Sequence, residues 1–336
     1  MAIGAAPLAA ARALDVAGIG LAVASVGWTL WTGRSGRGDP LPLAGLQCAC
    51  AVTYVAARAA ARWQRPLVPV TVVAGVASAL VLGSVVPSLA PLSPPLGYAN
   101  ANAALYVLAA VAAVMAAAAF PPGPATAIAL PVGVAFALAA VVSGSITGVV
   151  VLCLAVLVLA ARAAGWVREP VIVCAVVLQA VVAVTAFVGV AQAVSDQPTT
   201  VGWAGRLVDD RRVVLWKDAA VIARHHPLDG AGPGSFREVS PTARADPDAR
   251  WAHSGFLQQA AEEGAVGLLL MLAVFWWGFA RLWWATLDTF TLFAAVAMAA
   301  LGLHASVDYV LHFPAVPLTA AALVGAASPS RREGPG

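Results

Sequence analysis

The chain has 336 residues, of which 61% are hydrophobic and 10% are charged. This composition lies outside the range of soluble globular proteins and within that of polytopic membrane proteins, so it excludes a domain with a water-soluble core. The formal net charge of +3 indicates no particular partner. The N-terminus lacks the order of basic segment, short apolar core and cleavage site that marks a signal peptide. We therefore expect the first apolar helix to remain as a membrane span.

The four cysteines lie inside apolar segments, at Cys48, Cys50, Cys153 and Cys174. In that setting they are interpreted as small hydrophobic residues and not as disulfide partners. The Cys-x-Cys spacing of the first two also permits metal binding, but no histidine or acidic residue lies nearby. We expect no metal site in this protein.

Apolar runs long enough to cross a hydrocarbon core of about 30 Å recur along the chain. They lie near 14–32, 41–61, 67–88, 101–120, 125–142, 146–161, 170–193, 264–283, 288–308 and 313–327. The sequence therefore predicts an all-α, polytopic integral membrane protein with about ten transmembrane helices. Its expected organisation is about seven helices in 1–194, an extracytoplasmic loop at 195–263, about three helices in 264–327 and a cytoplasmic tail at 328–336.

The distribution of arginine predicts the orientation, because basic residues in short loops remain on the cytoplasmic side. With the N-terminus inside, the inner segments collect Arg12, Arg58, Arg62, Arg65, Arg162, Arg168, Arg281, Arg331 and Arg332. The short outer loops contain Arg34 and Arg37. We therefore expect a plasma-membrane protein with both termini inside and the long loop outside.

The long loop contains one predicted helix and one predicted turn. Apolar residues recur at roughly helical spacing between Arg206 and Arg224, which is typical of an amphipathic helix on the membrane or on the bundle. The glycine- and proline-rich segment 227–234 then predicts a turn. Basic and acidic residues balance over 195–252, so we expect no nucleic-acid partner.

Three short patterns carry a resemblance to a known family. His253-Ser254 is followed, after residues 255–263, by Gly264-Ala265-Val266-Gly267. In the loop before it, Arg212 stands one helical turn before Trp216, and a Pro-x-x-Gly-x-Gly-Pro-Gly turn at 227–234 ends in an aromatic residue. Further on, His304-Ala305-Ser306-Val307-Asp308 precedes Pro314. These patterns resemble the O-antigen ligase and polymerase superfamily of membrane proteins.

The resemblance covers about 205–325 and is thinner upstream. Asn100-Ala101-Asn102 is similar to an Asn-x-Asn segment of the family. Ser143-Gly144-Ser145 stands where many members carry Ser-Arg-Gly, so one expected phosphate contact is missing.

The resemblance implies a glycosyltransferase of cell-surface polysaccharide assembly that works outside the membrane without a cofactor or metal. It would transfer a glycan from a polyprenyl-diphosphate carrier to a hydroxyl on a glycan, lipid or protein acceptor. Histidine titrates near neutral pH, which suits His253 as the catalytic base for that hydroxyl. A planar guanidinium binds a diphosphate through paired charge-assisted bonds, which suits Arg212 as the second catalytic residue.

The substrate-binding candidates have simpler structural interpretations that the sequence leaves open. They are Arg211, Arg206, Gly232, Gly234, His304, Asp308 and Asn102. The arginines are also expected on the polar face of an interfacial helix, and the glycines also suit a plain turn. His304 and Asp308 are spaced to share one helix face, where they would form a structural pair or contact substrate. Glu262 and Glu263 are interpreted as boundary charges before the span.

Two other functions remain open from the sequence. A non-catalytic or transport-type protein that binds a lipid-diphosphate glycan would also need Arg212, but it would have no need of a base at His253. A degenerate family member is the other alternative, because of the missing arginine near Ser143. Within the enzyme hypothesis, the sequence does not separate a ligase from a polymerase.

Overall fold

The computed structural model describes residues 5–35, 38–64, 66–85, 95–167, 169–194, 210–246, 248–285 and 288–327. Within these ranges the chain forms 13 α-helices and two short 3₁₀ turns. Nine of the described helices are long and apolar enough to cross a membrane. The chain is therefore a polytopic membrane protein, as the sequence predicted.

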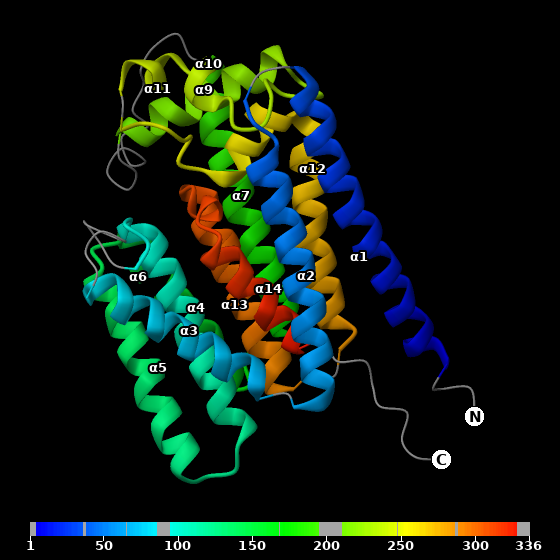
Figure 1. The fold of residues 1–336 in the computed structure, drawn as a ribbon, viewed down its shortest axis with the longest axis vertical. Helices are drawn as coiled ribbons and strands as arrows, with labels where there is room; N and C mark the ends of the chain where they lie inside the picture. The colour runs from blue at the N-terminus through cyan, green and yellow to red at the C-terminus, as the bar shows by residue number, and fades with distance from the viewer. Residues whose placement is uncertain are drawn as a thin grey trace.

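Among the described residues, seven helices precede the long loop, and Figure 1 shows their arrangement. They are α1 (Ala5–Thr32), α2 (Leu41–Trp63), α3 (Leu67–Val85), α4 (Ala99–Ala119), α5 (Pro124–Val142), α6 (Ile146–Ala163) and α7 (Pro170–Val194), with a 3₁₀ turn η1 (Gly33–Ser35) after α1. The helices that follow are α9 (Asp210–His225), α10 (Phe236–Val239), α11 (Pro241–Ala245), α12 (Gly255–Trp283), α13 (Thr289–Val307), η2 (Val310–His312) and α14 (Ala315–Ala327).

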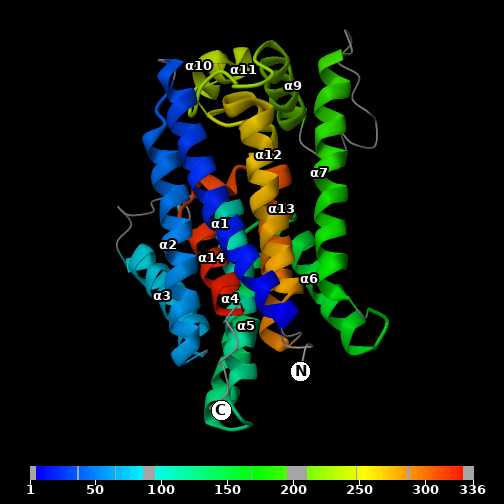
Figure 2. The same cartoon turned by 90° about the vertical axis from the view of Figure 1, so that its right-hand side faces the viewer.

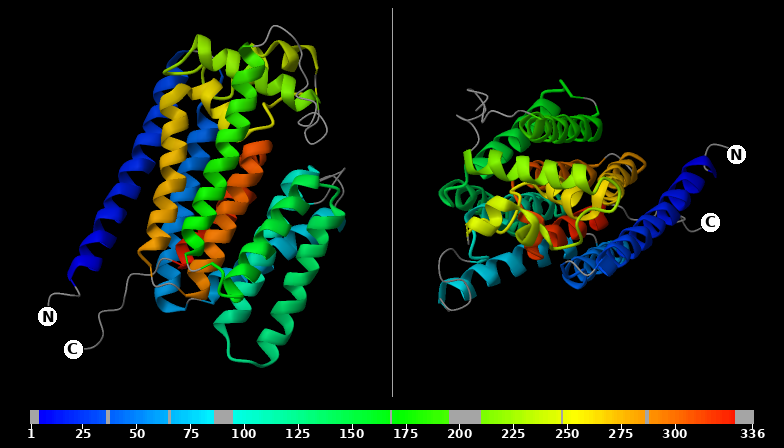
Figure 3. Two further views of the ribbon diagram at one scale, coloured as in Figure 1. Left: turned by 180° about the vertical axis from the view of Figure 1, so that it is seen from behind. Right: turned by 90° about the horizontal axis from the view of Figure 1, so that it is seen from above.

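The helices of the long loop lie together at one end of the bundle. Figure 1 and the right-hand view of Figure 3 show α9, α10 and α11 lying across this end, which we call the loop end. The helix α9 occupies most of the stretch for which the sequence predicted an amphipathic helix, and it packs against α7 and α12. Helix α1 begins and α14 ends toward the opposite end (Figure 2).

The centre of the bundle is formed by α4 and α13, which are almost entirely buried by their neighbours. Helix α4 is rich in alanine, and small side chains let helices approach closely where lipid gives no hydrophobic driving force. Gly148 of α6 shows the same principle, because a Cβ atom there would lie 2.6 Å from the Cβ of Ala103 in α4. In contrast, α1 contributes few buried residues and lies at the edge of the bundle.

Helix α12 is broken at Gly264, which has φ +69° and ψ −167°. The segment after α9 lies against this break, because Ala265 N–H donates to the carbonyl of Pro227 at 2.9 Å. The predicted span 264–283 is the part of α12 that follows the break. The preceding part, from Gly255, extends the helix into the region that the sequence assigned to the loop.

We expect Gly264→Ala to unfold the protein at a lower temperature than the wild type. Its Cβ atom would meet the carbonyl carbon of Leu228 at 2.3 Å, and the residue would keep a positive φ, so a loss of about 2 kcal/mol or more is expected. The matched control is Gly20→Ala in α1, where a Cβ atom meets nothing within 4 Å. Thermal unfolding in detergent measures both, and equal midpoints would show that the break does not need glycine.

Candidate functional site

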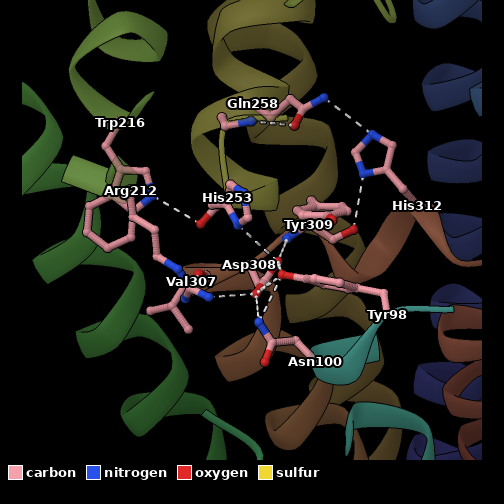
Figure 4. Close-up of polar contacts among 11 residues, drawn as sticks. Tyr98, Asn100, Arg212, Trp216, His253, Gln258, Val307, Asp308, Tyr309 and His312 are labelled. Atoms are coloured by element: carbon pink, nitrogen blue, oxygen red, sulfur yellow. Dashed lines mark hydrogen bonds and ion pairs between the residues drawn. The ribbon is translucent and has the colours of Figure 1, made fainter. Parts of the chain in front are cut away.

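At the loop end, the side chains of Arg212 and His253 lie beside the carboxylate of Asp308, and the three residues come from separate segments (Figure 4). Arg212 comes from the first turn of α9, His253 precedes α12, and Asp308 follows α13. These segments are far apart in sequence and are brought together only by the packing of the helices. The structure thus places both predicted catalytic residues, His253 and Arg212, beside the predicted substrate-binding residue Asp308.

Asp308 is the centre of the cluster. Helix α13 ends at Val307, and Asp308 adopts an extended conformation with a side chain that is 0% exposed. Its carboxylate accepts hydrogen bonds from the Tyr98 hydroxyl at 2.9 Å, from the Asn100 amide and from the Tyr309 N–H at 2.7 Å. A buried carboxylate is expensive unless its oxygens are paired in this way.

Arg212 pairs with the same carboxylate from the other side. Its Nη2 donates to Asp308 Oδ2 at 3.1 Å and its Nη1 to the Val307 carbonyl at 2.8 Å. The side chain is 20% exposed. A guanidinium has five N–H donors, so these two bonds leave capacity for an anion. The fixed orientation means that an anion would bind to a guanidinium already in place.

His253 is held in an unusual backbone conformation. Its φ of +50° makes it the single non-glycine residue with a positive φ in the described part of the chain. Trp216 Nε1 donates to the His253 carbonyl at 3.0 Å, and Ser254 caps α12 by accepting from Leu257 N–H. Such conformations cost free energy and concentrate at functional sites, where the surrounding structure maintains them.

The imidazole of His253 faces Asp308. Its Nδ1 lies 3.5 Å from Asp308 Oδ1, and its side chain is 16% exposed. A carboxylate beside one ring nitrogen favours a proton on that nitrogen, which leaves Nε2 as the acceptor. With the proton on Nδ1, Nε2 would be free to accept a proton, as a general base must.

The contacts of Asp308 also determine its charge. Burial by itself raises the pKa of the carboxyl group, but the His253 side chain, the Arg212 guanidinium and the Tyr309 N–H outweigh it, so the pKa is lowered. The carboxylate is therefore ionised at neutral pH. It carries the negative charge that holds Arg212 and faces the imidazole of His253.

Aromatic rings form a wall next to this cluster. Tyr309 stacks on Tyr98 with ring centroids 4.8 Å apart and touches the His253 ring edge-on at 4.8 Å. The Trp251 ring completes this wall, with its centroid 4.0 Å from that of His312 and 6.1 Å from that of Tyr309. Burial raises the pKa of the Tyr98 hydroxyl, so this group remains a hydrogen-bond donor to Asp308.

Gly232 and Gly234, for which the sequence left open a role in substrate binding or a plain turn, lie outside the cluster. Gly232 N–H donates to the Glu262 carbonyl at 2.8 Å, and Gly234 N–H to Glu262 Oε2 at 2.9 Å. Phe236 N–H binds the other oxygen, Oε1, at 3.1 Å. These amides are thus used to attach the turn to α12. Glu262 is buried and structural, and the interpretation as a boundary charge was wrong.

The remaining substrate-binding candidates are spread over several environments. His304 is fully buried, and neither ring nitrogen has a hydrogen-bond partner among the residues that the structure describes. Because α13 ends before Asp308, the helical pairing expected for these two residues does not form. Asn102 is buried and accepts from Leu96 N–H, whereas Arg211 pairs with Asp246 at an exposed position. Arg206 lies outside the described residues.

Sequence reasoning missed several members of the cluster. Asn100 contacts Asp308, whereas the predicted substrate-binding residue was Asn102 of the same Asn-x-Asn segment. The two asparagines are close in sequence but point in different directions on a helix, so the motif by itself did not show which one faces the site. Tyr98 and Tyr309 carried no signal beyond their positions next to Asn100 and Asp308.

We expect Asp308→Asn to lower the stability at neutral pH by about 3 kcal/mol, because it leaves Arg212 without its counter-ion. The lowered folded-state pKa means that the carboxylate stabilises the protein above its ordinary pKa of 3.8, and that this stabilisation is lost as the pH falls through the folded value. The difference between wild type and variant should therefore narrow below about pH 4.

Thermal unfolding in detergent at several pH values checks this expectation. The control is the exposed Asp248→Asn, which should match the wild type at every pH. A stability difference between the wild type and Asp308→Asn that stays constant down to pH 3 would contradict the lowered pKa of Asp308.

A comparison with known protein families found one match to this chain. Residues 131–272 match a family profile described as O-antigen ligase. The matched range includes Arg212, His253 and the break at Gly264, whereas Asp308 lies beyond it. No curated protein matches the chain significantly. Over residues 131–272, the chain contains a domain of the O-antigen ligase family of membrane proteins.

Proposed function

We propose that this protein is a glycosyltransferase that moves a glycan from a polyprenyl-diphosphate carrier to an acceptor hydroxyl. Members of the O-antigen ligase family are ligases or polymerases of surface polysaccharides, and the family domain includes Arg212 and His253 of the proposed site. We place the loop end on the outer face of the plasma membrane, with both termini inside, because arginines concentrate near the opposite ends of the helices.

The arrangement of Arg212 supports a diphosphate as the leaving group. No nucleotide sugar is present outside the cytoplasm, so the driving force must come from the bond between the sugar and its carrier. Negative charge develops on the diphosphate as this bond breaks, and a preorganised cation stabilises that charge. Arg212 is preorganised by Asp308 and Val307, and it keeps unused N–H donors.

The acceptor hydroxyl needs a base, and His253 supplies one. In the proposed step, the acceptor oxygen forms a bond with the anomeric carbon as the bond from that carbon to the diphosphate oxygen breaks. The proton of the hydroxyl passes to Nε2 of His253, and the diphosphate leaves beside Arg212. Asp308 stabilises the imidazolium that results, because the carboxylate lies 3.5 Å from Nδ1.

The strained backbone of His253 is the observation that carries the proposal. A carrier that only binds a lipid diphosphate needs a cation at Arg212 but no imidazole held in a costly conformation. Here the positive φ of His253 is maintained by the bond from Trp216 and by the cap at Ser254. Strain of this kind is typical of catalytic side chains that must be aimed accurately.

We expect His253→Ala and His253→Gln each to lower glycan transfer by at least about 100-fold, because the base is lost. In a strain that lacks the native gene, the lipid-linked donor should accumulate while the glycan product disappears. The control is His225→Ala, at the exposed end of α9, which should leave transfer unchanged.

The length ladder of the wild-type product separates a polymerase from a ligase. Normal glycan output from both His253 variants, inserted at wild-type levels, would remove the base from the mechanism and favour a carrier.

A second test addresses the leaving group. Arg212→Lys keeps the charge but loses the paired N–H geometry, so kcat/KM for the donor should fall by about tenfold or more. Arg211→Lys is the matched control, because its neighbouring guanidinium pairs with exposed Asp246 and should tolerate the change. Initial rates with purified protein and a lipid-linked donor measure both. Equal losses in the two variants would show that Arg212 has no special role.

A further inference from the structure

Gln258 lies in the first turn of α12, shortly after His253, and its side chain joins three segments of the chain. The side chain is 2% exposed, so its amide needs hydrogen-bond partners inside the protein. Its Oε1 accepts from the Ala252 N–H at 3.1 Å. Its Nε2 donates to Glu262 Oε1 at 3.1 Å and lies 3.3 Å from Nε2 of His312, toward which Figure 4 shows it pointing. The proposed mechanism uses none of these contacts.

The three contacts fit one orientation of the amide. Only the oxygen accepts a hydrogen bond, so the bond from Ala252 places the NH₂ group on the side of Glu262 and His312. One N–H then donates to Glu262 Oε1 and the other to His312 Nε2. His312 can accept this bond when its proton is on Nδ1, which lies 3.2 Å from the Tyr309 carbonyl. The oxygen and both N–H groups of the Gln258 amide are thus bound.

The bond from Ala252 constrains the backbone of His253 on one side. Ala252 is buried and lies between α11 and α12, so its N–H obtains its partner from a side chain and not from a helix. On the other side, Trp216 Nε1 binds the His253 carbonyl at 3.0 Å. The φ angle of His253 is a rotation between these two bonded groups. Anchoring both of them therefore opposes relaxation of the residue to a negative φ.

His312 gives Gln258 a second route, to the imidazole of His253. The His312 ring packs against Trp251, with ring centroids 4.0 Å apart, and its Nδ1 lies at the Tyr309 carbonyl. The Tyr309 ring in turn meets the His253 ring edge-on, with centroids 4.8 Å apart. A displacement of His312 would therefore be transmitted to the ring that packs against the imidazole.

We propose that Gln258 is a positioning residue for His253, which acts through Ala252 and His312 to hold the imidazole beside Asp308. This role rests on the proposed function, because it matters for catalysis only if His253 accepts the proton of the acceptor hydroxyl. A base that is displaced by a fraction of an ångström loses its alignment with the reacting hydroxyl. Loss of the Gln258 amide should therefore slow the chemical step and leave substrate binding unchanged.

The next residue, Gln259, provides a matched control. Its amide donates to Glu263 Oε2 at 2.6 Å, so it binds a carboxyl group one helical turn further on. The Gln258 amide makes the same kind of pair with Glu262. In the described part of the chain, the Gln259 amide has no hydrogen bond to the segment 249–254 or to η2. Gln259→Met therefore removes a similar helical pair without removing a support of the His253 segment.

The first experiment separates kcat from KM. Purified full-length variants are assayed over a range of concentrations of an envelope extract from the strain that lacks the native gene, which supplies the native donor and acceptor. Gln258→Met keeps the length of the side chain but loses all three hydrogen bonds, so apparent kcat should fall by about tenfold or more. Apparent KM should stay within about twofold, because no contact to substrate is removed. Gln259→Met should match the wild type in both.

A second measurement needs no turnover. Hydrogen–deuterium exchange over residues 249–256 should be faster in Gln258→Met than in the wild type, because the Ala252 N–H loses its acceptor. Gln259→Met should keep the wild-type rate there. Gln258→Glu retains a side-chain oxygen for this N–H, so it should restore slow exchange and most of the lost kcat. This conservative variant also provides the comparison with the wild type if Gln258→Met does not fold.

The two measurements separate failure of this role from failure of the proposed function. Equal kcat values for Gln258→Met and Gln259→Met would overturn the positioning role, and so would a loss that Gln258→Glu does not reverse. Unchanged exchange over 249–256 in Gln258→Met would overturn it as well, because the segment would then be held without Gln258. Normal transfer by His253→Gln would instead remove the proposed function, and faster exchange in Gln258→Met would then show a structural role alone.

Discussion

A buried carboxylate in a membrane protein must be paired, and Asp308 meets this requirement by joining segments from the whole chain. Arg212 reaches it from α9, His253 from the start of α12, and Tyr98 and Asn100 from the start of α4. Removing any of these partners would leave charge or hydrogen-bonding capacity unsatisfied in a dry environment. The same contacts that stabilise the carboxylate also bring the side chains of His253 and Arg212 to one carboxylate.

A second structural feature fixes the position of His253 at the start of α12. The glycine-rich turn after α9 binds the broken helix through Glu262, whose carboxylate accepts from Gly234 and Phe236. These bonds attach the loop to α12 after His253. The hydrogen bond from Trp216 of α9 to the His253 carbonyl attaches the loop to His253 itself. A loop would ordinarily be the most mobile part of such a protein. Here it is attached at two points, so the strained conformation of His253 can persist.

The sequence by itself determined the membrane class, the approximate positions of the spans and the amphipathic helix that became α9. It also identified His253 and Arg212 as the candidate catalytic residues. These follow from hydrophobic run length, helical periodicity and short motifs, which are local properties. Only the tertiary structure decided that Asn100 and not Asn102 contacts Asp308, and that the Gly234 amide binds the Glu262 carboxylate. Those outcomes depend on how α4, α12 and α13 are rotated and where α13 ends, and packing between distant segments sets both.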